Sequence, residues 1–442
     1  MGQKGMLFWV WLAERLGAAN RDFPKLIAMY GNPYELFHAE EGELERIEGI
    51  HSRTAELLSN KSLDAATKIL DTCERLGIGI LPYGDRNYPL SLRELRDPPI
   101  VLYYTGELLE FSDLLCIGMV GTRRMSEYGL GRAYKLSYEI AAAGAAIVSG
   151  MAAGIDGVCA AAALAAGGKT VAVLGCGLDV VYPKHHRRLM GEIAKRGLIV
   201  SEYPPGTPPN HYQFPVRNRI ISGLSQGTVV IEAGIGSGSL ITARNAILQG
   251  KDVFTVPANI DSPGAEGTNG LLRDGAHPVL ESEDVLRRYR GLYGDVLKRD
   301  VFGDAARASR VNLQYLADLG VIELTNPVPS GTERTGAVPE QKEKPKRTAK
   351  RSTSKESQPT AEPRVEASAK NEAAKKPTPD DVLKSLTSIQ VEILEAMPDD
   401  RAITVDALAG MGFPYGDLIA ALTMLEILGL IQKLPGALYM KT

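Results

Sequence analysis

Short aliphatic runs alternate with helical stretches between about residues 81 and 283, and a glycine-rich turn follows each run. Strands that lie parallel in a sheet need long crossover connections, which are usually helices, and those helices cover both faces of the sheet. The alternation therefore predicts an α/β fold built on a parallel sheet. The expected strands are residues 115–120, 146–149, 170–174, 198–201, 228–232 and 252–256, with residues 100–104 as a further strand at the sheet edge.

The segment before this region has a helical pattern. Apolar residues recur at helical spacing over residues 6–76, and Asn32-Pro33 marks a break between helices. Residues 47–50 resemble half of a helix-hairpin-helix, whose turn can present N–H groups to a DNA phosphate. His51 stands where a second turn glycine is expected, which favours a plain corner between two helices. We expect a small helical domain of the SAM or helix-hairpin-helix type.

A change in composition separates the C-terminal region from the sheet. Residues 325–380 are rich in Lys, Glu, Pro, Ala, Ser and Thr, which predicts a disordered linker. Three expected helices at 386–397, 404–410 and 415–429 precede a hairpin around Pro435-Gly436, and this order indicates a winged helix. The predicted parts are a helical domain at 1–80, a Rossmann-like domain at 81–290, a helical extension at 291–324, the linker at 325–380 and a winged helix at 381–442.

The overall charge excludes a protein that attracts nucleic acid over its whole surface. The formal net charge is −3 and the pI is about 6.2, so any contact with a polyanion has to be local. The apolar run at residues 6–12 is too short to span a bilayer, so we expect a cytoplasmic protein without a membrane contact. The cysteines are scattered without a C-x-x-C pair, which predicts buried thiols and no metal site.

The loops after the expected strands carry groups that bind anions. In a parallel sheet these loops lie at one edge, where ligands sit against helix N-termini. After the first strand, Gly121 lets backbone N–H groups approach an anion, and Arg123 offers a guanidinium fork. Two later loops add small residues and unpaired N–H donors, which predicts a phosphate site. The expected contacts from these later loops are Ser149, Gly150, Gly236, Ser237 and Gly238.

Two further segments add cations and an aromatic ring. A ring that stacks a base, beside cations that hold phosphates, is how single strands are bound with little sequence preference. No spacing matches a P-loop or a G-x-G-x-x-G motif, so we expect no ATP, no NAD and no other cofactor. The residues are Phe214 with Arg217, Asn218 and Arg219, and the run 184–188, which begins with Lys184.

Each of these residues also has a structural explanation when it is taken alone. Glycines at strand ends often serve close packing, Asp156 and Asp179 can cap helices or turns, and Phe214 can belong to the core. Cations beside glycines at a predicted strand or turn mouth favour ligand contact, as at Arg123, Lys184 and Arg217.

Many ordered motifs run through residues 83–279. They are Tyr88-Pro89, Asp97-Pro98-Pro99, Gly121-x-Arg123, Ser149-Gly150-Met151-Ala152-x-Gly154-Ile155-Asp156, Gly175-x-Gly177-x-Asp179-x-x-Tyr182-Pro183, Ser201-Glu202-Tyr203-Pro204, Phe214-Pro215-x-Arg217-Asn218-Arg219-Ile220-Ile221, Ser237-Gly238-Ser239-Leu240-x-Thr242-Ala243 and Gly267-Thr268-Asn269 with Gly275-Ala276. In this order they resemble the DprA (Smf) family of DNA-processing proteins. The sequence departs from the family pattern at Ala160, where a histidine is usual, at His186, where an asparagine is common, and at Ala258, where a glycine is common.

The resemblance implies a protein that binds incoming single-stranded DNA during natural transformation, forms a homodimer and loads RecA recombinase onto the strand. A single-strand-binding protein is a further candidate partner. The resemblance implies no catalytic residue. The positions carried over are Arg123 and Lys184 as phosphate contacts, Arg217 and Asn218 as lining of the same pocket, and Leu271 and Leu272 near the dimer surface.

Two other classes of function compete with this one. Lysine-decarboxylase-like phosphoribohydrolases surround a nucleotide with acids, here Glu232 and Asp156, but residues 234–242 do not match their P-G-G-x-G-T-x-x-E pattern. Ala160 stands where the DprA (Smf) family usually has a histidine. If that histidine were the general base of a hydrolase, its loss would abolish the reaction, so Ala160 favours a binding protein over a hydrolase. A regulator of duplex DNA would use the third helix of the winged helix, yet residues 415–429 hold acids and no Lys or Arg. We therefore expect the winged helix to contact protein.

Overall fold

The chain forms two compact units, Met1–Arg334 and Thr335–Thr442. The computed structural model describes residues 3–40, 42–262, 264–298, 310–324, 388–398 and 402–411, with single residues and short runs between 413 and 441. The linker expected at 325–380, and most of the helix expected at 415–429, lie outside the described residues.

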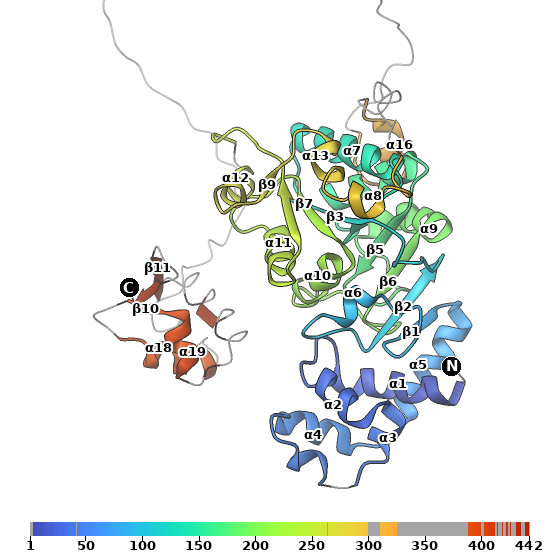
Figure 1. Ribbon diagram of the computed structural model, residues 1–442, viewed down its shortest axis with the longest axis vertical. Helices are drawn as coiled ribbons and strands as arrows, with labels where there is room; N and C mark the ends of the chain where they lie inside the picture. The colour runs from blue at the N-terminus through green and yellow to red at the C-terminus, as the bar shows by residue number, and fades with distance from the viewer. Residues whose placement is uncertain are drawn as a thin grey trace, which may run out of the picture. The chain divides into compact units, whose positions relative to one another are not determined.

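A nine-stranded sheet runs through the described part of the first unit (Figure 1). Its strands are β1 (Gly79–Pro82), β2 (Val101–Gly106), β3 (Cys116–Val120), β4 (Ala146–Ser149), β5 (Thr170–Leu174), β6 (Leu198–Ser201), β7 (Gly227–Val230), β8 (Asp252–Thr255) and β9 (His277–Pro278). Their order is β1-β2-β6-β5-β4-β3-β7-β8-β9, and all neighbours from β6 to β9 are parallel, whereas β2 is antiparallel to both β1 and β6. From β3 the chain adds β4, β5 and β6 on one side of the sheet and then β7, β8 and β9 on the other side. The direction in which strands are added therefore reverses between β3 and β7.

All the predicted strands form, so the parallel α/β core is confirmed. The strand expected at the sheet edge is β2, but β1 lies outside it, so the edge position was wrong. The sequence pattern also missed β1 and β9. Both are short and contain proline, so neither carries a β-branched run that marks a strand.

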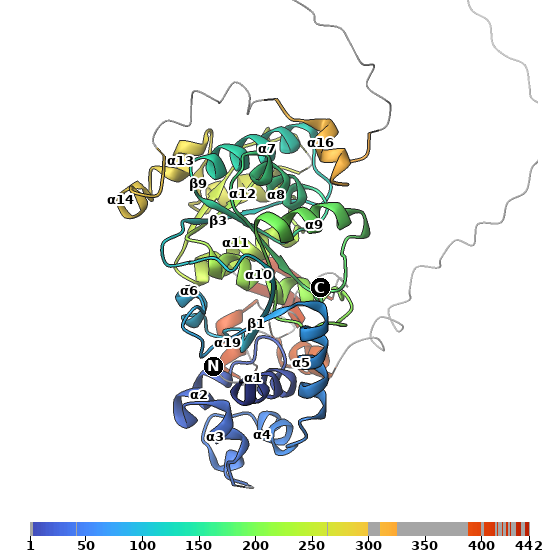
Figure 2. The same ribbon diagram turned by 90° about the vertical axis from the view of Figure 1, so that its right-hand side faces the viewer.

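Helices cover the two faces of the sheet, as the two views show (Figures 1 and 2). Side chains alternate along each strand. In β3, Ile117 and Met119 therefore join the hydrophobic cluster beneath the first group of helices, and Cys116 and Val120 join the cluster beneath the second. The first group is α7 (Glu127–Ala142), α8 (Ile155–Ala165) and α9 (Arg187–Arg196); the second is α10 (Gln213–Leu224) and α11 (Gly238–Leu248), with the short α6 (Leu90–Arg93) beside α10.

The N-terminal helical domain packs on the first face through a shared core that includes Trp9 and Trp11. The predicted break is confirmed, because the Asn32 side chain accepts hydrogen bonds from the first N–H groups of the following helix. At the glycine turn, the Asp22 carboxylate accepts from the His51 N–H group at 3.1 Å and from the Thr54 hydroxyl at 2.6 Å. These internal bonds favour a plain helix corner. The helices are α1 (Gln3–Leu16), α2 (Phe23–Tyr30), α3 (Pro33–Phe37), η1 (Leu44–Arg46), α4 (Ser52–Ser59) and α5 (Asp64–Leu76).

The segment after the sheet packs back onto the first face. Its described part has only short helices, so the helical extension expected at 291–324 is less regular than predicted. Leu316 is fully buried, and the Arg188 guanidinium of α9 donates to the Asp318 carbonyl at 3.1 Å. Its helices are α13 (Ser282–Leu286), α14 (Arg290–Tyr293) and α16 (Leu313–Asp318), whereas α12 (Glu266–Arg273) lies earlier in the chain, between β8 and β9.

The second unit has the element order of a winged helix. Two described helices lead to an antiparallel hairpin, and a short strand adds to its edge, so the sheet order is β10-β12-β11. Ile393, Leu408 and Leu422 are fully buried in its own core. The elements are α18 (Ser388–Ala396), β10 (Ile403–Thr404), α19 (Val405–Gly410), β11 (Ile431–Leu434) and β12 (Leu438–Lys441). In neither unit does a described helix have the length and apolar character to cross a bilayer.

Candidate nucleic-acid interface

A cavity of about 760 Å³ opens at the carboxyl ends of β3 and β7, where the strand order reverses. Ligands of open parallel sheets bind at such reversal points, because the loops diverge there and leave a crevice. We call it the first cavity. The loop after β3 forms one wall, the loop before α11 forms another, and the first turns of α10 form the third. The predicted residues among its lining are Gly121, Arg123, Phe214, Arg217, Asn218, Gly236, Ser237 and Gly238.

An aromatic wall carries a cation at the mouth of this cavity. The Phe214 ring stacks on the Tyr182 ring, with centroids 5.2 Å apart and planes inclined by 23°. The Arg123 guanidinium lies 5.4 Å from the Phe214 centroid, a distance at which cation and ring attract. Arg123 is exposed and forms no ion pair with a carboxylate of the described residues. Its charge is therefore available to an anion.

Arg217 lies beneath this wall and, unlike the exposed Arg123, is buried. It is 4% exposed, and its guanidinium donates to the Gly150 carbonyl at 3.0 Å and to the Val173 carbonyl. Burial lowers the pKa of Arg217 to about 10, against the opposing effect of Asp156. Arg217 remains charged at neutral pH. Its main contacts hold the ends of β4 and β5 together, and its contact with DNA stays a prediction.

Asp156 is the buried acid of the site. Its carboxylate accepts from the Gly150 N–H group at 3.0 Å. Burial raises the pKa of Asp156 to about 6, although Arg217 and three backbone N–H groups favour the charged form. A side chain at Gly150 would place its Cβ 2.7 Å from an Arg217 nitrogen and 2.8 Å from an Asp156 oxygen. Gly150 is therefore required for packing, as the structural explanation expected.

Two residues of the segments expected to bind anions turn inward. Ser149 is fully buried and its hydroxyl donates to the Asp156 carbonyl at 3.3 Å, so its side chain supports the loop, and its contact with DNA stays a prediction. His186, in the basic run, is also fully buried, and burial lowers its pKa to about 4. Lys184 is exposed on the 3₁₀ turn η2 (Lys184–His186), two residues after Tyr182, but it does not line the cavity.

The glycine loop before α11 forms the wall opposite the aromatic rings. The Ser237 hydroxyl accepts from the Ser239 N–H group as the N-cap of α11. The Asn218 amide donates to the Gly238 carbonyl at 3.2 Å and accepts from the Arg217 side chain at the same distance. Asn218 thus ties α10 to this loop. Gly236 and Gly238 have no heavy atom within 4 Å of the position a Cβ would take, so they leave space for a ligand.

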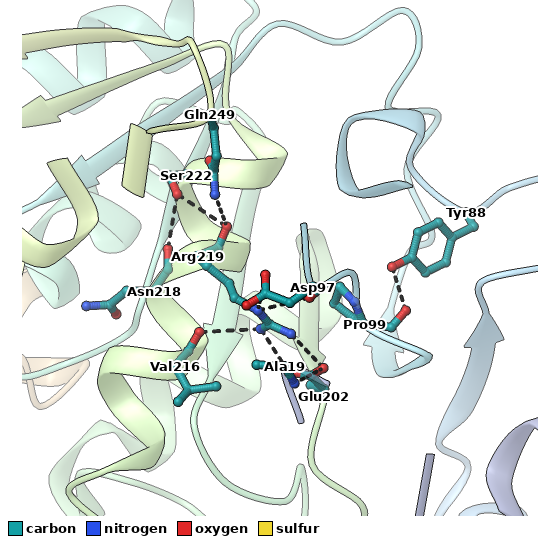
Figure 3. A network of polar contacts seen from close by, with 10 residues as sticks. All are labelled: Ala19, Tyr88, Asp97, Pro99, Glu202, Val216, Asn218, Arg219, Ser222 and Gln249. Carbon is teal, nitrogen blue, oxygen red and sulfur yellow. Dashed lines mark hydrogen bonds and ion pairs between the residues drawn. The ribbon is translucent and has the colours of Figure 1, made fainter. Parts of the chain in front are cut away.

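Arg219 points away from the cavity, although the sequence pattern grouped it with Arg217 (Figure 3). It forms two hydrogen bonds of 2.8 Å to the Glu202 carboxylate and an ion pair of 3.2 Å to Asp97. The grouping was wrong because residues two apart on a helix do not face each other. Glu202 also accepts from the Ala19 N–H group of the helical domain at 3.3 Å, so this cluster joins α10 to that domain.

Comparison with known proteins identifies the family. A family model described as DNA recombination-mediator protein A matches residues 79–290, and one described as the DprA winged helix domain matches residues 374–437. Protein Smf of Synechocystis is 31% identical to the chain over 450 residues, which cover 100% of both proteins. The chain belongs to the DprA/Smf family of DNA-processing proteins.

Two further DprA proteins are similar over part of the chain. DNA processing protein DprA of Bacillus subtilis is 40% identical over 218 residues, which are 49% of this chain and 73% of that protein. The X-ray structure of DprA from Streptococcus pneumoniae superposes with a TM-score of 0.57 and 34% identity, and it covers 64% of this chain and 97% of that one. The predicted DprA/Smf resemblance and the Rossmann-like core are confirmed.

The three departures from the DprA/Smf pattern fall at different places. Ala160 is fully buried in α8 and has no access to the first cavity. His186 is buried behind the loop after β4, where its Nδ1 bonds the Met151 carbonyl at 3.1 Å. Ala258 lines a second cavity beside the first. The described residues contain no cluster of three His, Cys, Asp or Glu side chains that could hold a metal, and all four cysteines are buried thiols.

The sequence pattern missed two parts of this DprA/Smf site. Tyr182 was quoted only within a motif, and its stack on Phe214 joins residues 32 positions apart that no local pattern connects. Glu202 was not connected to Arg219, although an acid directly after a buried strand is a signal for a buried ion pair. Both parts depend on contacts between loops.

Proposed function

We propose that this protein binds single-stranded DNA in the first cavity and loads RecA recombinase onto the strand. The observation that carries the proposal is the Arg123 guanidinium over the Phe214 ring, which itself stacks on the Tyr182 ring. Rings stack unpaired bases and cations hold phosphates, which suits a single strand and not a duplex, whose bases are already stacked. Family membership supports DNA as the ligand. RecA loading and a homodimer rest on the family resemblance, and a cytoplasmic location rests on the apolar run at residues 6–12, which is too short to span a bilayer.

The test is a salt titration of binding to oligo-dT by wild-type protein and by Arg123→Ala and Lys184→Ala. Each variant is expected to bind more weakly, and each should flatten the slope of log affinity against log salt by about 0.7, the value for one phosphate contact of a single strand. Lys68→Ala is the matched control, because Lys68 is an exposed lysine on α5. Unchanged affinity and slope for Arg123→Ala would refute the assignment of the first cavity.

The competing function is hydrolysis of nucleoside monophosphates, with Glu232 as the acid. Both Glu232 carboxylate oxygens accept from the Ser126 N–H group, and one also accepts from the Ser126 hydroxyl. These bonds hold Glu232 at the start of α7, and Glu232 does not line the first cavity, where the proposed ligand lies, which favours binding over hydrolysis. Release of free base from nucleoside monophosphates by pure protein, abolished in Glu232→Gln, would revive the enzyme.

A further inference from the structure

A second cavity of about 750 Å³ lies beside the first, and Arg124 lines both. It opens at the ends of β7 and β8 against the first turn of α7. We propose that the second cavity is a base subsite for the nucleotide adjoining the one in the first cavity, and that it prefers guanine. This inference rests on the proposed function, because it assigns a second position on the same single strand.

The walls of the second cavity suit a flat aromatic ligand. They are mainly apolar, formed by Met125, Tyr128, Ile231 and Pro257. The Tyr128 hydroxyl donates to the Pro257 carbonyl at 3.0 Å, which holds the ring across the opening. The Tyr128 side chain is still 50% exposed, so its ring offers a surface on which a base can stack. The space and the walls therefore match those of a nucleobase.

Arg124 stands where the backbone between two nucleotides would pass. It is exposed, and it forms no ion pair with a carboxylate of the part of the chain that the structure describes. Its N–H group donates to the Thr122 hydroxyl at 3.2 Å, so the backbone of the loop is held while the side chain is exposed to solvent. A phosphodiester joins each pair of neighbouring nucleosides. A strand with one base in each cavity would therefore carry a phosphate close to Arg124.

Glu232 gives the second cavity its chemical preference. Its Oε2 atom accepts from the Ser126 N–H group and hydroxyl at 3.0 Å, whereas its Oε1 atom accepts the same N–H group at 3.3 Å. A carboxylate has about four lone-pair sites, so it can accept further donors. A Cβ at Gly264 would lie 2.8 Å from Oε1, so this glycine of the cavity wall keeps the space beside Oε1 open.

Guanine fits this acceptor better than the other bases. Its Watson–Crick edge presents two adjacent N–H donors, and a carboxylate can accept both, whereas thymine presents one donor between two carbonyl oxygens that a carboxylate repels. Single strands leave this edge accessible to protein groups. Glu232 is half-buried, whereas the acid that lines the first cavity, Asp156, is only 7% exposed and accepts from the Gly150 N–H group.

The test measures how well short ligands displace labelled dT15 from the full-length protein. The ligands are pdT, pdTpdT, pdTpdG and pdGpdT. For wild-type protein, one guanine dinucleotide is expected to bind about tenfold more tightly than pdTpdT, in the range of one bidentate base contact. Equal affinities of all three dinucleotides would overturn the base preference, and a dinucleotide that binds no better than pdT would overturn the subsite.

Ala258→Leu tests the cavity itself. Ala258 lines the second cavity, and its backbone is held by two hydrogen bonds to Asn269, so a larger side chain fills space without releasing the loop. The ratio of dinucleotide to mononucleotide affinity is expected to fall about tenfold, the order of one lost base stack. The same change at Ala166, at the far end of α8, is the control and should leave this ratio as in wild type. A ratio in Ala258→Leu equal to that of the control would overturn the subsite.

Glu232→Gln separates recognition from structure. A role limited to holding Ser126 would lower the affinity of all ligands by one factor, and the guanine preference would persist. The proposal expects the preference for guanine over thymine to disappear, and its persistence would overturn the role of Glu232.

If wild-type protein fails to bind dT15, the proposed function itself fails. If wild-type protein binds dT15 and Ala258→Leu behaves as its control, only the second subsite fails.

Discussion

Glu202→Gln is expected to lower the free energy of unfolding of the first unit by about 3 kcal/mol. Arg219 and Glu202 are 6% and 9% exposed, and two hydrogen bonds of 2.8 Å join them. Breaking a buried ion pair costs about 3–5 kcal/mol, because one charge is left buried without its partner. Asp97 still contacts the Arg219 guanidinium at 3.2 Å, which places the expected loss at the lower end of this range.

Thermal unfolding followed by circular dichroism measures this loss. The first unit spans Met1–Arg334. At an unfolding entropy of about 2.1 cal/mol/K per residue, 1 kcal/mol shifts the Tm of a unit of this size by about 1.4 °C, so the expected fall is about 4 °C. The matched control is Glu107→Gln, which breaks the exposed pair of Glu107 with Lys169 and should cost about 1 kcal/mol or less. A Tm for Glu202→Gln equal to that of the control would refute the reasoning.

A second measurement on Glu202→Gln concerns DNA. The cluster holds the helix that carries Phe214, so binding to oligo-dT is expected to weaken. The slope against salt should stay as in wild type, because no phosphate contact is lost. Replacing both partners, with Glu202→Leu and Arg219→Met together, should recover part of the stability, because no buried charge is then left unpaired.

Three further predictions concern other parts of the molecule. Burial raises the pKa of Asp156 to about 6, so the folded protein binds a proton at this carboxylate more tightly than the unfolded chain does. The free energy of unfolding of wild type, measured by urea titration relative to Asp156→Asn, should therefore fall by about 1 kcal/mol from about pH 5 to about pH 7. Removal of residues 381–442 should leave affinity for oligo-dT unchanged in filter binding; a collapse of affinity with the remainder folded would place the DNA site elsewhere. Leu272→Glu, at a half-buried position of α12, should shift a dimer toward monomer in sedimentation; unchanged sedimentation would remove Leu272 from the dimer surface.

The core of the fold was predictable because each parallel strand is a local signal. Residues 170–174 and 146–149 are apolar runs with a turn on each side, and they form β5 and β4 as expected. The sheet edge was not predictable, because it depends on which distant segments pair. β2 pairs with β6 through residues such as Tyr103 and Ser201, which lie far apart in the chain.

The site was predictable where topology alone brings residues together. The loops after parallel strands meet at one sheet edge, and this placed Arg123, Phe214 and Gly236 around one cavity. Burial was harder to predict. Ser149 and Arg217 belong to the same loops and helix as exposed residues, and only the packing of β4 and β5 beneath them decides that they turn inward.

Helix α10 shows why two arginines in one motif have different tasks. Arg217 and Arg219 are separated by about 200° around a helix, so one faces the strand ends and the other faces Glu202 and Asp97. The second contact extends to the helical domain through the Ala19 N–H group (Figure 3). A shift of that domain would therefore act on α10 through Glu202 and Arg219. The helical domain is thus linked to the Phe214 ring through one helix, which is the path that Glu202→Gln interrupts.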